Sequence, residues 1–164
     1  MKVKKIMTAE PAFCYGADSL TKAALIMWQR DCGAVPVVDA ENKVTGIITD
    51  RDICVAIASR DQKASEITAA ELCSGAVLTA QPDDDIKKAV KLMRKNQFRR
   101  LPVADEEGRL LGIVTLADIV LAAGAKKKNK SARKRVFSLI EAISKKPPIR
   151  LSEITAETAG NGED

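Results

Sequence analysis

The stretch GIITDRD at residues 46–52 returns downstream as GIVTLAD at residues 112–118, with glycine, two aliphatic residues, threonine, two variable residues and aspartate in the same places. Gly112 follows Gly46 by 66 positions, because 112 minus 46 is 66. The same offset continues towards the N-terminus without a gap, as shown by four matched pairs: Pro36 with Pro102, Asp39 with Asp105, Leu20 with Ile86, and Met27 with Met93. A period of this length exceeds the roughly 20 to 50 residues of stacked repeats. We therefore expect two similar halves packed face to face about a pseudo-twofold axis.

Hydrophobic periodicity predicts the same order of elements in both halves, which indicates an α/β (α+β) fold. Each half is expected to contain a short extended piece, a helix, two strands joined by a hairpin turn and a second helix, in the order β-α-β-β-α. These elements are expected at residues 12–14, 20–31, 36–39, 44–49 and 50–59 in the first half, and at residues 76–79, 86–96, 102–105, 110–115 and 116–123 in the second. The expected units are a first motif at residues 1–62 and a second motif at residues 63–125.

The composition favours a small soluble protein. With 164 residues and 46% apolar content, the chain is long enough for one compact core. No apolar run approaches the roughly 18 residues needed to cross a bilayer. We therefore expect a cytoplasmic protein that does not insert into membranes.

The cysteines align with apolar residues of the other half. The pairs are Cys14 with Ala80, Cys32 with Phe98, Cys54 with Val120, and Cys73 with Met7. Because no CxxC pair occurs, this pattern predicts buried, reduced, structural thiols rather than a metal site. The sequence also lacks histidine, the commonest general base near neutral pH. We expect no catalytic residues, no bound metal and no required cofactor.

Three longer segments extend the repeat into a family resemblance. They are MTAEPAFCYGADSLTKAALIMWQRDCGAVPVVD at residues 7–39, VTGIITDRDI at residues 44–53 and NQFRRLPVADEEGRLLGIVTLADI at residues 96–119. Together they resemble a tandem pair of CBS domains, the Bateman module, of the small stand-alone bacterial type. The resemblance covers about residues 3–124. It implies a regulatory module that binds an adenosyl ligand such as AMP, ADP, ATP, NAD or S-adenosylmethionine.

The threonine and aspartate of GxxTxxD have two possible roles. Their spacing is that of a helix capping box, in which both side chains satisfy backbone amides at the start of a helix. The start of a helix also attracts phosphate, and an aspartate can accept hydrogen bonds from two ribose hydroxyls. The family resemblance implies that Asp52 and Asp118 bind ribose and that Thr49 and Thr115 lie beside the phosphates. The pattern alone leaves capping and ligand binding both open.

The resemblance also places the adenine base beside the first strand of each half. Main-chain groups near Val35 and Leu101 would contact the edge of the base, and the small residues Gly33 and Ala34 leave room for it. These positions complete the expected adenine site.

Arginines near these strands are candidates for phosphate contacts. Arg99 and Arg100 replace the two small residues in the second half, and Arg51 lies in the first turn of a helix, where a solvated arginine is an equally good explanation. Asp50 would repel phosphate in the first site, whereas a leucine replaces it in the second. We therefore expect the site at Asp118 to bind more tightly.

The positive charge of the chain is concentrated near its C-terminus. Residues 126–135, KKKNKSARKR, contain seven basic residues and no acidic one, whereas residues 1–125 contain 17 of each kind. An amphipathic helix is expected at residues 126–146, with a cap at Ser131, a stop at the two prolines that follow and a partly disordered tail at residues 147–164. Its apolar stripe, which we expect to pack on the module or on a second subunit, consists of Val136, Phe137, Leu139, Ile140 and Ile143.

The leading hypothesis is a non-catalytic sensor that binds an adenosyl ligand in the cleft between the two motifs. A homodimer and an unidentified protein target are expected partners. The alternative is a nucleic-acid or partner-protein binding module that acts through the basic helix. Because the chain has only five aromatic residues and none interrupts the basic run, base stacking has little support.

Overall fold

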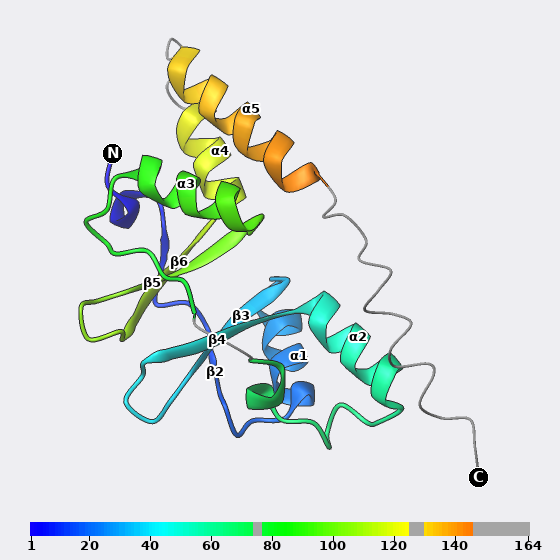
Figure 1. Ribbon diagram of the computed structural model, residues 1–164. Helices are drawn as coiled ribbons and strands as arrows, with labels where there is room; N and C mark the ends of the chain where they lie inside the picture. Colours follow the sequence, from blue (N-terminus) through cyan, green and yellow to red (C-terminus); the bar gives the residue numbers. More distant parts are fainter. Residues whose placement is uncertain (74–76, 125–129, 146–164) are drawn as a thin grey trace.

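The computed structural model describes residues 1–73, 77–124 and 130–145, and within them two three-stranded sheets carry helices on their outer faces (Figure 1). The strands are β1 (Thr8–Ala9), β2 (Cys14–Tyr15), β3 (Ala34–Val38), β4 (Val44–Thr49), β5 (Arg100–Ala104) and β6 (Leu110–Thr115). The α-helices are α1 (Leu20–Gln29), α2 (Asp50–Arg60), α3 (Ile86–Asn96), α4 (Leu116–Gly124) and α5 (Lys130–Ser144). The sheet orders are β2-β3-β4 and β1-β6-β5, and each sheet is built on one helix–hairpin–helix unit, so the predicted fold of two repeated halves is confirmed. The extended piece predicted at residues 76–79 forms no strand in its described part, residues 77–79. None of the helices in these ranges is long and apolar enough to cross a membrane.

Most element boundaries follow the sequence pattern, with local exceptions. The second strand of each hairpin and α3 begin and end where the pattern predicts. The first strand of each hairpin begins two residues before the proline expected to start it. Proline is usually found at the start of a strand because it has no N–H to donate to a neighbouring strand. Pro36 can lie inside β3 because β2 pairs with β3 only from Val37 onward, so Pro36 lies opposite β4 alone. α1 ends at Gln29, two residues early, because Asp31 takes a left-handed φ of 47°.

The segment that precedes each half packs into the other half. β1 pairs antiparallel with β6, and Val3 is fully buried in the core of the second half. Ala69, which lies 66 positions after Val3, is fully buried in the core of the first half. Two isolated strand pairings repeat this relation: Lys2 with Asp85, and Thr68 with Ser19. This reciprocal exchange ties the two halves into one body.

The two hairpin turns meet at the pseudo-twofold axis. The Val44 N–H donates to the Gly108 carbonyl at 2.9 Å, and the Leu110 N–H donates to the Asn42 carbonyl at the same distance. The two donors lie 66 positions apart in sequence, and so do the two acceptors. The two sheets therefore join through their turns, and β4 and β5 come to the junction (Figure 1).

The glycine that begins each GxxTxxD motif is required by a close approach. A Cβ on Gly46 would lie 2.1 Å from the Cys73 Sγ atom, and a Cβ on Gly112 would lie 2.7 Å from the Met7 Sδ atom and 2.9 Å from the Thr8 carbonyl oxygen. Cys73 and Met7 occupy equivalent places in the two exchanged segments. The repeated glycine therefore makes room for the segment that crosses over from the other half.

Replacing Gly46 by alanine should destabilise the fold by about 1 to 3 kcal/mol, because the added methyl group overpacks the site. The free energy of unfolding, measured by urea denaturation, checks this. Most of the penalty should vanish in a Cys73→Gly background, where the clashing atoms are absent. Gly124→Ala is the control, because nothing in the described structure lies within 4 Å of a Cβ at that position. Equal stability of Gly46→Ala and the wild type would contradict this explanation of the motif.

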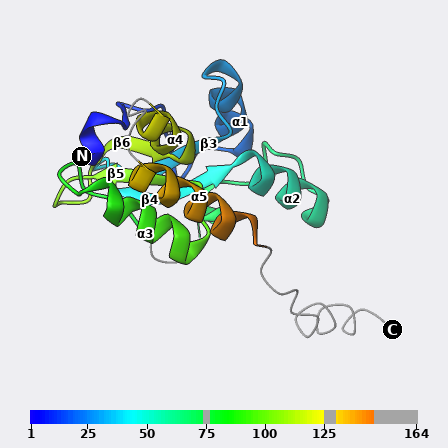
Figure 2. The same ribbon diagram turned by 90° about the horizontal axis from the view of Figure 1, so that it is seen from above.

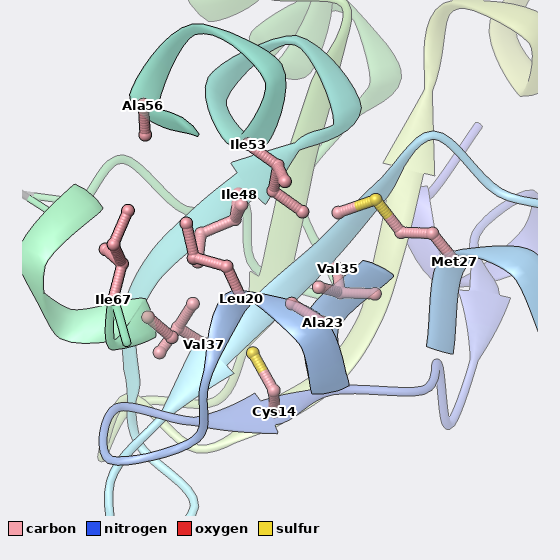
Figure 3. Packing of buried hydrophobic residues seen from close by; sticks show 11 residues of the cluster. Cys14, Leu20, Ala23, Met27, Val35, Val37, Ile48, Ile53, Ala56 and Ile67 are labelled. Carbon is pink, nitrogen blue, oxygen red and sulfur yellow. The ribbon is translucent and has the colours of Figure 1, made fainter. Parts of the chain in front are cut away.

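The core of the first half lies between its sheet and the helices α1 and α2 (Figure 3). Leu20, Ile48 and Ile67 are fully buried in it. Cys14 is also fully buried there, and burial raises the pKa of its thiol to about 11. The prediction that all four cysteines are buried holds for Cys14 only: Cys32 and Cys73 are half-buried, and Cys54 is exposed. Its position on the outer face of α2 admits an apolar residue without requiring burial.

Helix α5 packs against α3 and α4 and closes the core of the second half (Figures 1 and 2). Leu139 is fully buried, and Val136 and Ile143 pack around it. The predicted stripe is thus confirmed in part, but Phe137 and Ile140 remain 71% and 41% exposed because they lie on the side of the helix away from this core.

The described part of α5 begins at Lys130, so Ser131 lies inside the helix and is not its cap. The Ser131 hydroxyl accepts a hydrogen bond from Arg135. The two prolines and the tail at residues 147–164 lie outside the described residues.

Candidate functional site: a cleft between the two halves

A cleft of about 810 Å³ lies where β4 and the start of α2 face β5. Residues 45–47 and 49–51 come from the first half, and residues 97–102 come from the second. Residues 72–73 and 77–78 of the connecting segment and residues 143–145 at the end of α5 complete the walls. The cleft is large enough for a nucleotide, since ligand pockets typically measure about 300 to 1,000 Å³.

The walls of the cleft are positively charged. The described residues that line it include four basic side chains, Arg51, Arg99, Arg100 and Lys145, and one acidic side chain, Asp50. Arginine and lysine side chains form charge-assisted hydrogen bonds with phosphate oxygens, and Arg51, Arg99 and Lys145 are exposed to a ligand. The arrangement is therefore suited to an anionic ligand.

Arg100 reaches across the junction of the halves. A Cβ on Gly33 would lie 3.1 Å from the Arg100 Nη2 atom and 3.0 Å from the Asp50 Oδ2 atom. A larger residue at Gly33 would force one of these side chains to move. Gly33, which was predicted to leave room for the adenine base, therefore also makes room for Arg100 of the other half.

Both GxxTxxD motifs form the predicted capping box. In the first, the Asp52 Oδ2 atom accepts from the Thr49 N–H at 2.9 Å and from the Thr49 hydroxyl at 2.7 Å, and the Asp52 N–H donates to the Thr49 Oγ1 atom. In the second, Asp118 and Thr115 make the same three hydrogen bonds. Within the described residues, neither aspartate has a hydrogen-bond partner on Oδ1. One oxygen of each carboxylate caps its helix, and the other is available to a ligand.

The amides at the start of α2 are already satisfied, which differs from the expectation of free donors for phosphate. The Asp50 N–H donates to the Gly33 carbonyl at 3.4 Å, and the Arg51 N–H donates to the Asp50 side chain at 2.8 Å. The Asp52 N–H is engaged by the capping threonine. Side-chain cations, and not free helix amides, are thus the groups that this cleft offers to an anion.

The predicted site residues divide into two groups. The cleft brings together Thr49, Arg51, Arg99, Arg100 and Leu101. Ala34, Val35, Asp52, Thr115 and Asp118 are not among the described residues that line it. Of this second group, Ala34 and Val35 are buried in β3. Thr115 and Asp118 lie at the start of α4, in the places that Thr49 and Asp52 occupy at the start of α2.

Asp52 nevertheless lies close to the cleft. The pKa of the Cys73 thiol, which lines the cleft, is raised first by burial and then by the charge of the Asp52 carboxylate. The thiol is therefore held in its neutral form, which is the less reactive one.

Sequence reasoning missed several lining residues. Leu78 and Phe98 are 38% and 43% exposed and give the cleft apolar surface, and Gln97 ties its wall to the end of α5. The exposed Phe98 lies directly before the two arginines in the sequence, but no pattern distinguishes it from a core residue. The contribution of α5 depends on a contact between residues far apart in the chain.

A second concave surface lies between α3 and α5. It measures about 360 Å³, and its described lining contains five basic side chains and no acidic one: Lys87, Lys91, Arg94, Lys134 and Arg135. The residues of this groove are different from those of the cleft. This groove gathers positive charge from α3 and α5 on one surface.

Comparison with known proteins identifies the family. The CBS domain family matches the chain twice, at residues 3–59 and 69–124. MK0525 of Methanopyrus kandleri is 32% identical over 117 residues, which cover 71% of this chain but only 57% of the length of MK0525. YlbB of Bacillus subtilis is 34% identical over 123 residues, which cover 74% of this chain and 81% of YlbB.

A solved structure supports the same conclusion. The crystal structure of the CBS domain pair of MJ0100, in complex with 5′-methylthioadenosine and S-adenosyl-L-methionine, is similar with a TM-score of 0.67 and 32% identity. The match covers 77% of this chain and 98% of that one. With two matched motifs, an internal repeat and this structural likeness, the chain belongs to the CBS-domain family, as a tandem pair of CBS motifs.

Proposed function

We propose that this protein is a non-catalytic sensor that binds a phosphorylated adenosine ligand, of the class of AMP, ADP, ATP and NAD, in the cleft between its two CBS motifs. The observation that carries the proposal is the cleft of about 810 Å³ with four basic side chains and one acidic side chain among its described walls. The adenosyl ligands of the MJ0100 domain pair support the adenosine part of the ligand.

The distribution of polar and apolar groups matches the parts of a nucleotide. Phe98 and Leu78 offer apolar surface for the base, next to the main chain of Leu101. The free Oδ1 atom of Asp52 would accept a hydrogen bond from a ribose hydroxyl at the edge of the cleft. Arg99 and Arg100 would bind the phosphates, as predicted from the sequence. Ala34, Val35, Thr115 and Asp118 would serve a symmetry-related site, formed by β3 of the first half and the start of α4 of the second.

The charge of the cleft favours a phosphorylated ligand over S-adenosylmethionine. The sulfonium group of that ligand is a cation, and the three arginines and Lys145 of the cleft would repel it. Phosphate oxygens instead pair with the arginines. Asp50 opposes phosphate binding, but the three arginines outnumber it.

Ligand binding would regulate the protein by changing how the two motifs sit against each other. A ligand shifts such an equilibrium only by its differential affinity for the two arrangements. The cleft takes its walls from both motifs, so a change in their arrangement alters the contacts of the ligand.

We propose a cytoplasmic protein without a required cofactor.

Exposed apolar side chains support a partner for this sensor. Trp28 and Leu121 are 84% and 72% exposed and lie on helices of different motifs. Burying each would be worth about 1.5 to 3 kcal/mol. We propose that a second copy of the chain, or a target protein, covers these two side chains.

A thermal-shift panel of ATP, ADP, AMP, NAD and S-adenosylmethionine tests the function. We expect a Kd of about 1 to 100 μM for at least one phosphorylated ligand, which corresponds to about 5.5 to 8 kcal/mol. At roughly one hundred times Kd, the ligand should raise the melting temperature by about 5 to 10 °C. S-adenosylmethionine at the same concentration should produce a smaller shift. An unchanged melting temperature with all five ligands at millimolar concentration would contradict the proposal.

A further inference from the structure

The last turn of α5 forms one wall of the cleft, although it lies beyond the two CBS motifs. The family match ends at residue 124, whereas Ile143, Ser144 and Lys145 line the cleft together with Arg99 and Arg100. A bound molecule would therefore touch a helix that does not belong to either motif.

A polar tether fixes this turn to the ligand-binding strand. The Gln97 side-chain amide donates to the Ala142 carbonyl at 3.4 Å and to the Lys145 carbonyl at 3.1 Å. Gln97 lies two residues before Arg99. These bonds satisfy carbonyls at the negative end of the helix, which would otherwise repel an anion. The end of α5 can then present the Lys145 amine and the Ser144 hydroxyl to the cleft.

The Lys145 amine can exchange its present partner for a phosphate. Its Nζ atom lies 3.4 Å from a carboxylate oxygen of Glu141, and the two side chains are 70% and 57% exposed. Exposed ion pairs of this kind contribute little to the stability of the folded protein. A phosphate oxygen held between Arg99, Arg100 and this amine is a stronger partner, because several cations share it.

Resting on the proposed function, we propose that α5 is part of the ligand site: Lys145 contacts the phosphates of the bound nucleotide, and binding holds the end of α5 against the second CBS motif. Linkage makes this coupling reciprocal, so a docked α5 raises the affinity for the nucleotide and the nucleotide stabilises the docked helix. The regulated element of the sensor is therefore α5.

Calorimetric titration of ATP and adenosine into the full-length wild type, Lys145→Ala and Lys134→Ala tests the contact. We expect Lys145→Ala to weaken ATP binding by about 3- to 10-fold, because a charge-assisted contact to phosphate is lost. Adenosine, which lacks phosphate, should bind the wild type and Lys145→Ala equally. Lys134→Ala removes the same charge from α5 away from the cleft and should leave ATP affinity unchanged.

Amide hydrogen exchange of residues 130–144 tests the coupling. ATP at saturating concentration should slow exchange in the last turn of α5 in the wild type, because opening of the helix would break ligand contacts. The protection should be smaller in Lys145→Ala. If the wild type binds ATP but Lys145→Ala binds it equally well and α5 gains no protection, this inference is wrong and the sensor function stands. If the wild type binds no phosphorylated adenosine ligand, both proposals are wrong.

Discussion

Leu139→Ala should lower the free energy of unfolding by about 2 to 5 kcal/mol, because it removes a large side chain from a packed core and leaves a cavity. Leu139 is fully buried where α5 meets α3 and α4. Urea denaturation followed by circular dichroism measures the effect.

The matched control lies on the same helix. Phe137→Ala removes a larger side chain that is 71% exposed, so it should cost well under half as much. Equal costs for the two variants, or a cost of Leu139→Ala below about 1 kcal/mol, would show that α5 is an appended arm and not part of the second core.

Asp52→Ala and Asp118→Ala should each weaken the binding site that contains the aspartate by about tenfold to a hundredfold. A hydrogen bond to a charged group is worth about 1.5 to 3 kcal/mol, and the free Oδ1 atom would make such a bond to ribose. Each variant also removes a helix cap, which lowers stability by about 1 kcal/mol but does not by itself change affinity. Calorimetric titration with ATP, combined with urea denaturation, separates the two effects.

Glu71→Ala is a capping control for this pair of variants. The Glu71 Oε1 atom accepts hydrogen bonds from the Thr68 N–H and hydroxyl, the same capping arrangement as in the two GxxTxxD motifs. Glu71 does not line the cleft. This variant should lose stability and keep its affinity. If both aspartate variants behave in the same way as Glu71→Ala, the GxxTxxD motifs cap helices and do nothing more.

The repeat made the fold predictable because each half repeats the same hydrophobic pattern and the same turn. The hairpin strands that end at Thr49 and Thr115 are each preceded by a polar turn and followed by a capped helix, so local signals agree with the tertiary structure. The exchange of Val3 and Ala69 between the halves was not predictable. It depends on packing between segments that are distant in sequence, which hydrophobic periodicity does not predict.

The candidate site was predictable only where the motif itself contributes. Thr49 and Arg100 come from segments that the repeat brings to the junction, and both line the cleft. Gln97 and Lys145 are polar residues near helix ends, where sequence patterns indicate only solvation. Their role arises from the docking of α5, a contact that spans more than 40 residues of sequence.

The most direct test of the central claim is a crystal structure of the full chain grown with saturating ATP. We expect electron density for the nucleotide in the cleft, with its phosphates beside Arg99 and Arg100 and its base against Phe98. Density for ATP in the basic groove between α3 and α5 only, or no bound nucleotide at millimolar concentration, would contradict it.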